Sequence, residues 1–159
     1  MKDYTKLPYR MGAIGIVLDE ENKVLIVQLN DYSDNEWNFP GGGRRDGEDG
    51  QKNILRELSE ELNVDEGSFK ILFKSSSDVV YDFPEDMREK EMPRALTYRG
   101  QIKEQFFVRF LGKKEDIIID RDELKDSRWV VFAELKKFLI FKGQYDKFIR
   151  DLDEFLTAQ

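Results

Sequence analysis

Residues 42–64, GGRRDGEDGQKNILRELSEELNV, carry the most informative pattern in the sequence. Residues 42–50 are rich in glycine and charge, which predicts a loop. Residues 51–62 then show helical periodicity, with Asp49 in position for an N-cap. Asn63 follows at the place where many helices end in a left-handed turn. This stretch therefore predicts a loop that leads directly into an amphipathic helix.

One side of the predicted helix gathers carboxylates. At 100° per residue, Glu57, Glu60 and Glu61 share a sector about 100° wide. An apolar stripe beside this sector consists of Leu55, Leu58 and Leu62. A solvated acidic face is the ordinary interpretation, but like charges three and four residues apart destabilise a helix. A glycine triplet just before the helix also favours an anion there, and Mg²⁺ between phosphate and carboxylates would satisfy both.

Composition limits the chemistry that remains possible. The 159 residues are about one ordinary domain, with 26 basic and 33 acidic residues and a net charge of −7. The absence of cysteine excludes disulfides, Cys-ligated metal centres and cysteine nucleophiles. The absence of histidine excludes the Ser-His-Asp triad and imidazole ligands. An enzyme of this composition must work with carboxylates, lysines, hydroxyls and bound metal.

The sequence carries no targeting or membrane signal. Its first eight residues contain no apolar segment, and the longest apolar runs, residues 14–18 and 106–110, are too short to span a bilayer. We therefore expect a soluble cytoplasmic protein with no membrane partner. Net acidity argues against duplex DNA as a partner, because phosphate neutralisation needs clustered cations. The oligomeric state cannot be read from the sequence.

Strand and helix patterns alternate along the chain. Residues 12–18 and 23–29 predict a hairpin, and residues 133–140 and 144–156 predict helices. The further strand candidates are residues 69–74, 78–81, 95–99, 105–111 and 128–132. Residues 85–93 are charged and unpatterned, which predicts an exposed loop. This order favours an α/β fold in which helices cover both faces of a mixed sheet.

Residues 42–64 also resemble a known family signature. The spacing from Gly42 to Glu48, and on to Arg56, Glu57, Glu60 and Glu61, resembles the Nudix box, Gly-x5-Glu-x7-Arg-Glu-apolar-x-Glu-Glu-x-Gly-apolar. Six of its seven fixed polar or glycine positions are present. The departure is Asn63 in place of the last glycine, and Asn also tolerates a positive φ. The resemblance implies a Nudix fold, an α/β/α sandwich, with residues 1–159 as a single domain.

The resemblance also implies a catalytic centre. It makes Glu57, Glu60 and Glu61 ligands of Mg²⁺, for which Mn²⁺ could substitute, and a carbonyl near Gly41 a further ligand. Arg56 and Glu48 would form ion pairs that hold the loop to the helix. In such enzymes water attacks a phosphorus of a nucleoside diphosphate linked to a further group, and a carboxylate takes the proton. The base could be Glu60, Glu61 or a residue outside the box.

Segments outside the box resemble bacterial RNA pyrophosphohydrolases and dinucleoside polyphosphate hydrolases. They are residues 37–43, 81–84, 98–101 with 105–110, 122–130 and 141–142. The first of them departs from the subfamily pattern at Asn38 and Gly41. In residues 122–130 the resemblance makes Glu123 an additional metal ligand or base.

The same segments supply candidates for substrate binding. Phe141 could stack on a base and Lys142 could bind phosphate, while Arg10 and Tyr81 are further candidates. Each has an ordinary interpretation, as a surface cation or as a strand or core aromatic. Trp37 and Trp129 are predicted to pack in the core or against loops.

Three functions are compatible with these patterns. The first is Mg²⁺-dependent hydrolysis of 5′-polyphosphates, on triphosphorylated RNA, dinucleoside polyphosphates or both. The second is hydrolysis of free nucleotides, such as oxidised nucleoside triphosphates or ADP-ribose, which the more generic Asn38 and Gly41 suggest. The third is a nucleotide sensor that does not cleave its ligand. Such a sensor is expected to lose box carboxylates, whereas all of them are present.

Overall fold

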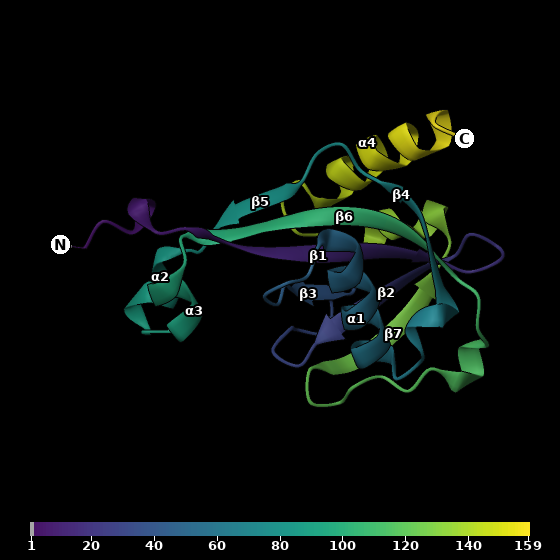
Figure 1. Cartoon of the computed structure of the whole chain (residues 1–159), viewed down its shortest axis with the longest axis horizontal. Coiled ribbons are helices and arrows are strands. Elements are labelled where there is room, and N and C mark those ends of the chain that lie inside the picture. The colour runs from purple at the N-terminus through teal and green to yellow at the C-terminus, as the bar shows by residue number, and fades with distance from the viewer. Residues whose placement is uncertain (1) are drawn as a thin grey trace.

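The computed structural model describes residues 2–159, and strands and helices alternate along the chain (Figure 1). The strands are β1 Tyr9–Leu18, β2 Val24–Leu29, β3 Gly41–Gly43, β4 Phe69–Lys74, β5 Val79–Asp82, β6 Gly100–Phe110 and β7 Leu124–Val130. The α-helices are α1 Gly50–Leu62, α2 Glu85–Glu89, α3 Pro93–Thr97 and α4 Gln144–Thr157. The 3₁₀ helices are η1 Tyr4–Lys6, η2 Glu66–Ser68, η3 Lys114–Asp116 and η4 Phe132–Lys137.

The strands form one mixed sheet. Its order is β4-β6-β1-β2-β7, with β3 paired to β1 and β5 paired to β6. β1 and β6 run parallel from Tyr9 opposite Gly100 to Leu18 opposite Arg109, and the other pairings are antiparallel. The two longest strands thus form the centre of the sheet.

Helices cover both faces of this sheet. On one face Ile54, Leu58 and Leu62 of α1 join a buried cluster with alternate residues of the central strands. On the other face α4 and η4 pack onto a second cluster that includes Phe148 and Phe155. The expected α/β/α sandwich with a mixed sheet is confirmed. Among residues 2–159, no helix is long and apolar enough to cross a membrane.

Several local predictions are confirmed. β1 and β2 form the expected hairpin, and α1 begins one residue before the predicted start. The Asp49 side chain caps α1 by accepting the backbone N–H of Lys52 at 2.8 Å. Asn63 ends the helix with φ 53° and ψ 47°, so the asparagine takes the left-handed conformation of the missing glycine.

Two predictions for residues 85–99 are wrong. Residues 95–99 do not form a strand, because α3 occupies Pro93–Thr97 and β6 begins only at Gly100. Pro93 stands in the first turn of α3, where its missing N–H costs nothing, and alanine and leucine favour the helix. The expected loop at residues 85–93 contains the short helix α2. Neither helix is long enough to show a clear period in the sequence.

The hairpin opens along its length, and this opening makes room for the site. β1 and β2 pair at Leu18 and Val24, after which residues 38–43 lie between them. Asn38 bridges to Val27, the Gly15 N–H donates to the Pro40 carbonyl at 2.8 Å, and β3 pairs with β1. Residues 41–43, which we call the glycine loop, are therefore held inside the sheet.

A separate excursion flanks the other end of β1. β5, α2 and α3 lie beside the first half of β1, at the end of the molecule where the N-terminal segment lies (Figure 1). Arg88 of α2 closes the base of this excursion by donating to the carbonyls of Phe83 and Arg99, both at 3.0 Å. The excursion is thereby fixed next to the N-terminal half of β1.

Candidate active site

Close contacts between the glycine loop and α1 build the floor of the site. Asn53 of α1 is buried and donates to the carbonyls of Gly42 and Gly43, at 3.3 and 3.2 Å. A β-carbon at Gly42 would lie only 2.5 Å from the carboxyl carbon of Glu57. Only glycine therefore allows this backbone to approach the carboxylate so closely.

Arg56 and Glu48 form the expected ion pair between helix and loop. Arg56 donates to the two carboxylate oxygens of Glu48 at 2.6 and 2.9 Å, and to the Gly43 carbonyl at 2.8 Å. The Arg56 guanidinium holds the pKa of Glu48 down at about 2, against burial, and the Arg45 N–H adds to the effect. Arg56 also donates to Glu57 at 3.0 Å, so one guanidinium orients both carboxylates.

Three carboxylates converge at one point beside the glycine loop. Glu57, Glu61 and Glu123 each offer an oxygen, and these oxygens all lie within 4.8 Å of one another. Glu57 and Glu61 lie one turn apart on α1, whereas Glu123 comes from the turn that precedes β7. The Asn30 N–H, just past the end of β2, donates to the Glu123 carbonyl at 2.9 Å and fixes that turn.

The electrostatics of this cluster call for a cation. Glu61 is 2% exposed, and its Oε2 atom has no hydrogen-bond partner among residues 2–159. Burial, with the nearby charges of Glu57 and Glu123, raises the pKa of Glu61 well above its usual value. Burial also raises the pKa of Glu57, against the effect of Arg56. Convergent, desolvated carboxylates of this kind are suitable ligands for a hard divalent cation.

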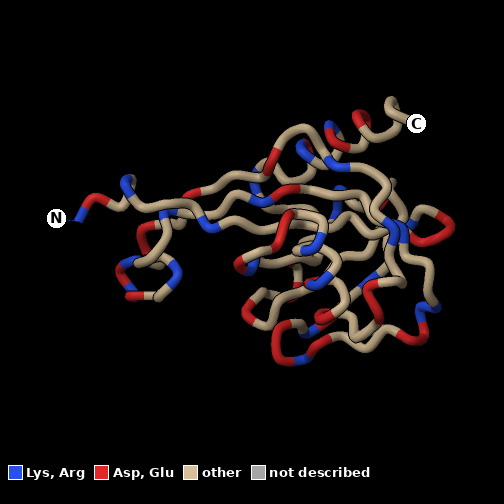
Figure 2. Tube along the Cα trace, in the orientation of Figure 1, with Lys and Arg blue, Asp and Glu red and all other residues tan. Residues whose placement is uncertain are grey.

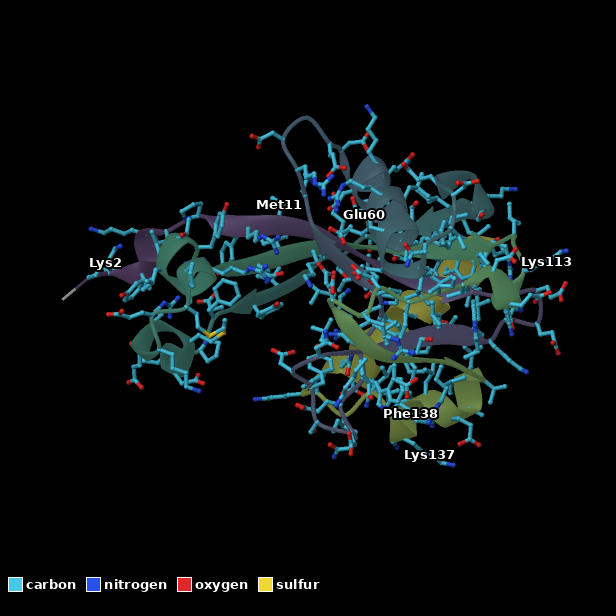
Figure 3. All side chains as sticks on the ribbon, turned by 90° about the horizontal axis from the view of Figure 1, so that it is seen from below. Lys2, Met11, Glu60, Lys113, Lys137 and Phe138 are labelled. Atoms are coloured by element: carbon cyan, nitrogen blue, oxygen red, sulfur yellow. The ribbon has the colours of Figure 1, made fainter. Side chains whose placement is uncertain are left out.

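Glu60 is not part of this convergence. Its side chain is 46% exposed and contacts the guanidinium groups of Arg45 and Arg56, each at 3.2 Å. Figure 3 shows Glu60 on the side of α1 next to the loop that precedes the helix. The structure thus splits the acidic sector: Glu57 and Glu61 turn toward the sheet, and Glu60 turns toward solvent.

The carboxylate cluster lines a cleft of about 360 Å³. The cleft is lined by Arg10, Leu29, Asn30, Asp31, Gly41, Gly42, Gly43, Glu57, Glu61, Arg94, Gln101, Lys103 and Glu123. We call Arg10, Arg94 and Lys103 the cationic wall. They come from β1, α3 and β6, so both signs of charge meet in one cleft. Figure 2 shows that basic and acidic residues are interspersed along the whole trace.

Of the other predicted site residues, some line the cleft and some do not. Gly41 and Arg10 line the cleft, and the Arg10 guanidinium lies against Gly43, where a β-carbon would overlap it. Phe141 packs edge-on against Tyr32 with ring centroids 5.5 Å apart. Tyr81 lies on β5 beside Phe83, and Lys142 is exposed. Phe141, Tyr81 and Lys142 are not among the residues that line the cleft.

Both tryptophans pack as expected. Trp37 is 4% exposed in the cluster beneath α4 and η4. Trp129 packs against the cluster beneath α1 and stacks on Phe110 at 6.1 Å. Neither residue lines the cleft.

Sequence analysis missed two of the three cations in the cleft. Lys103 stands two residues after Gln101 on the same strand, so strand alternation places both side chains on one face. The two-residue period of this strand could therefore have indicated that Lys103 shares a face with Gln101. Arg94 gave no comparable signal, because the segment around it was misassigned as a loop and a strand.

Comparison with known proteins identifies the class. A family model described as the NUDIX domain matches residues 8–152. The chain therefore belongs to the Nudix family, as residues 42–64 predicted. The chain is 34% identical to an RNA pyrophosphohydrolase of Sphingopyxis alaskensis over 142 residues, covering 88% of this chain and 89% of the relative. It is 31% identical to an RNA pyrophosphohydrolase of Zymomonas mobilis over 149 residues, covering 91% and 95%.

Solved structures show the same fold. A C. elegans Ap4A hydrolase superposes with a TM-score of 0.65 at 15% identity, covering 93% of this chain and 99% of that one. An E. coli dihydroneopterin triphosphate pyrophosphohydrolase superposes with a TM-score of 0.69 at 14% identity, covering 90% and 96%. At such low identity these structures establish the fold alone.

Proposed function

We propose that this chain is a magnesium-dependent hydrolase of 5′-polyphosphates that removes pyrophosphate from triphosphorylated RNA, cleaves dinucleoside polyphosphates, or does both. The observation that carries the proposal is the convergence of Glu57, Glu61 and Glu123 in a cleft that is also lined by cations. The relatives named RNA pyrophosphohydrolase support the substrate class. The cytoplasm, where bacteria such as the hosts of these relatives make their RNA, is the proposed location.

Glu57, Glu61 and Glu123 are the proposed ligands of Mg²⁺, or of Mn²⁺ in its place. Their fit rests on the unpartnered Oε2 of Glu61 and on the raised pKa values of Glu57 and Glu61, both signs of missing positive charge. When bound, the metal supplies charge stabilisation at the phosphoryl oxygens and helps to form the nucleophile. Arg56 keeps Glu57 oriented and, through Glu48, keeps the glycine loop beside it.

The reaction is a hydrolysis in which water forms a new bond to phosphorus while the bond to the bridging oxygen breaks. A carboxylate oxygen of the site accepts the proton of the water, and the bridging oxygen departs with the leaving group. Glu60 stays a proposed ligand or base. In this structure its carboxylate contacts Arg45 and Arg56 on the solvent side of α1, next to the cluster.

Hydrolysis of free nucleotides is the second candidate. It is favoured by Gly41, which lines the cleft where the resembled subfamily has glutamine. The third candidate, a sensor without activity, is disfavoured because every box carboxylate is present and three carboxylates of the site converge.

The test is product analysis with the purified chain and MgCl₂. The substrates are 5′-triphosphorylated RNA, diadenosine tetraphosphate and a panel of free nucleotides, and Glu57→Gln serves as the inactive control. We expect 5′-monophosphorylated RNA with pyrophosphate from the first substrate, or mononucleotide products from the second. A strong preference for one mononucleotide would establish the second candidate instead, and no turnover of RNA or dinucleotide would refute the first.

A further inference from the structure

The three residues of the cationic wall have no carboxylate partner. Within the part of the chain that the structure describes, the side chains of Arg10, Arg94 and Lys103 make no ion pair and donate no side-chain hydrogen bond. Elsewhere the chain pairs its partly buried cations readily: Arg56 with Glu48 at 2.6 Å and Lys147 with Asp151 at 2.8 Å. A chain with a net charge of −7 does not lack carboxylates for this purpose.

Lys103 is the most desolvated member of the wall. Burial and the neighbouring positive charges of Arg10 and Arg94 lower its pKa to about 8, although Glu61 and Glu57 act in the opposite direction. Burial and Arg94 likewise lower the pKa of Arg10. Like charges therefore oppose each other across the wall, and desolvated cations without a partner are unfavourable. A bound anion would remove both penalties.

We infer that Lys103, assisted by Arg94 and Arg10, binds the departing phosphates of the substrate and makes the chain prefer a leaving pyrophosphate to a leaving phosphate. This inference rests on the proposed function, and it assigns to the β6 and α3 side chains a role that the box does not supply. The attacked phosphoryl group would lie beside the three carboxylates, which would hold the metal. The cationic wall would then neutralise the charge that develops on the leaving group.

The charge of the cationic wall and the elements that carry it explain the preference for a leaving pyrophosphate. Three cations match the several negative charges of a pyrophosphate better than the smaller charge of a single phosphate. Lys103 extends from the central strand β6, so its backbone position is rigid, and Arg94 reaches the cleft from the short helix α3. Lys103 is therefore a substrate-binding residue on a rigid strand, and Arg94 adds positive charge from α3.

The first experiment measures binding without turnover. Isothermal titration in MgCl₂ compares methylenediphosphonate, a non-hydrolysable pyrophosphate analogue, with inorganic phosphate on the wild type and on Lys103→Met. The variant keeps the length of the side chain and removes its charge. We expect it to bind the diphosphonate about tenfold more weakly or worse, with a smaller change for phosphate.

Lys113→Met is the matched control. Lys113 is exposed and lies at the opposite end of the molecule from the N-terminal segment (Figure 3), and we expect its substitution to leave diphosphonate affinity unchanged. Equal affinity of Lys103→Met and wild type would overturn the inference, as would an equal loss in Lys113→Met or no saturable binding to the wild type. If Lys103→Met does not fold, Lys103→Gln takes its place.

The second experiment compares RNAs of one sequence that carry three or two 5′ phosphates. We expect Lys103→Met to lower kcat/KM for the triphosphorylated RNA about tenfold more than for the diphosphorylated RNA. The first RNA releases pyrophosphate, whose larger charge depends more on the Lys103 ammonium than does the single phosphate released by the second. An equal loss on both substrates would contradict the assigned preference. Failure of the proposed function is distinguishable, since a chain without turnover of either RNA still permits the binding measurement.

Discussion

Two buried carboxylates on opposite faces of the sheet differ in their hydrogen-bond partners. Asp151 of α4 is 3% exposed and accepts hydrogen bonds from Ser75 and Lys147, both at 2.8 Å, and from Gln105. Glu61 of α1 is 2% exposed, and its Oε2 atom has no partner among the described residues.

Hydrogen-bond partners distinguish this structural carboxylate from the functional one. Both residues lie on amphipathic helices and face the same sheet, so burial alone does not separate them. Asp151 has a cation and two further donors within its own network, which balances its charge. Glu61 instead faces two other carboxylates, and the repulsion between like charges is unfavourable until a cation binds.

The largest effect is expected for Glu61→Gln. Replacing a proposed metal ligand by a neutral isostere should lower kcat/KM for triphosphorylated RNA about 10³-fold. The melting temperature in EDTA should not fall, because burial already disfavours the charged form of Glu61. Steady-state kinetics and thermal melts check both parts. Near-normal turnover, or a clear loss of stability without metal, would contradict the functional role of Glu61 and remove its difference from Asp151.

Asp151→Asn should show the reverse pattern. We expect the free energy of unfolding to fall by about 2 kcal/mol, because the Lys147 ammonium loses its charged partner and the Ser75–Gln105 network loses an acceptor. Denaturant unfolding measures the loss. The value of kcat/KM should stay within about twofold of the wild type, since the network lies on the face opposite α1. A stable variant with impaired catalysis would contradict the structural assignment.

Glu60→Gln tests the exposed member of the acidic sector. We expect kcat/KM to fall about tenfold, clearly less than for Glu57→Gln, because the Glu60 carboxylate lies with Arg45 and Arg56 outside the cluster. Parallel kinetics of the two variants at saturating Mg²⁺ give the ratio. An equal loss would show that Glu60 leaves its arginine contacts and joins the metal.

The smallest effect is expected from the pH dependence of the Glu48–Arg56 pair. Arg56 lowers the pKa of Glu48 from 4.5 to about 2 in the folded chain. The pair therefore stabilises the fold fully above pH 4.5, by about 1 kcal/mol, and this contribution is lost as the pH falls toward 2. Melts of the wild type and Glu48→Gln should differ by a constant amount above pH 5, and the difference should shrink as the pH falls from 4.5 toward 2. A difference that grows on acidification would have the wrong sign.

The sequence predicted the local features of the site because they depend on short-range rules. The helix, its Asp49 cap and its left-handed Asn63 follow from patterns within a few residues. The ion pair between Glu48 and Arg56, which the resemblance to the Nudix box implied, is also local, since both residues lie in one loop and helix. Residues 85–99 were misread because two short helices of five residues each show too little periodicity.

By itself, the sequence determined the family, the sandwich of helices about a mixed sheet, and a carboxylate-based chemistry without histidine or cysteine. Tertiary structure selects the carboxylates that converge, because strand pairing across the sheet brings Glu123 to α1. It also decided that Glu60 turns to solvent while Arg94 and Lys103 face the cleft. The physical reason is that burial and the approach of distant charges are set by packing between elements, which no periodicity within one element records.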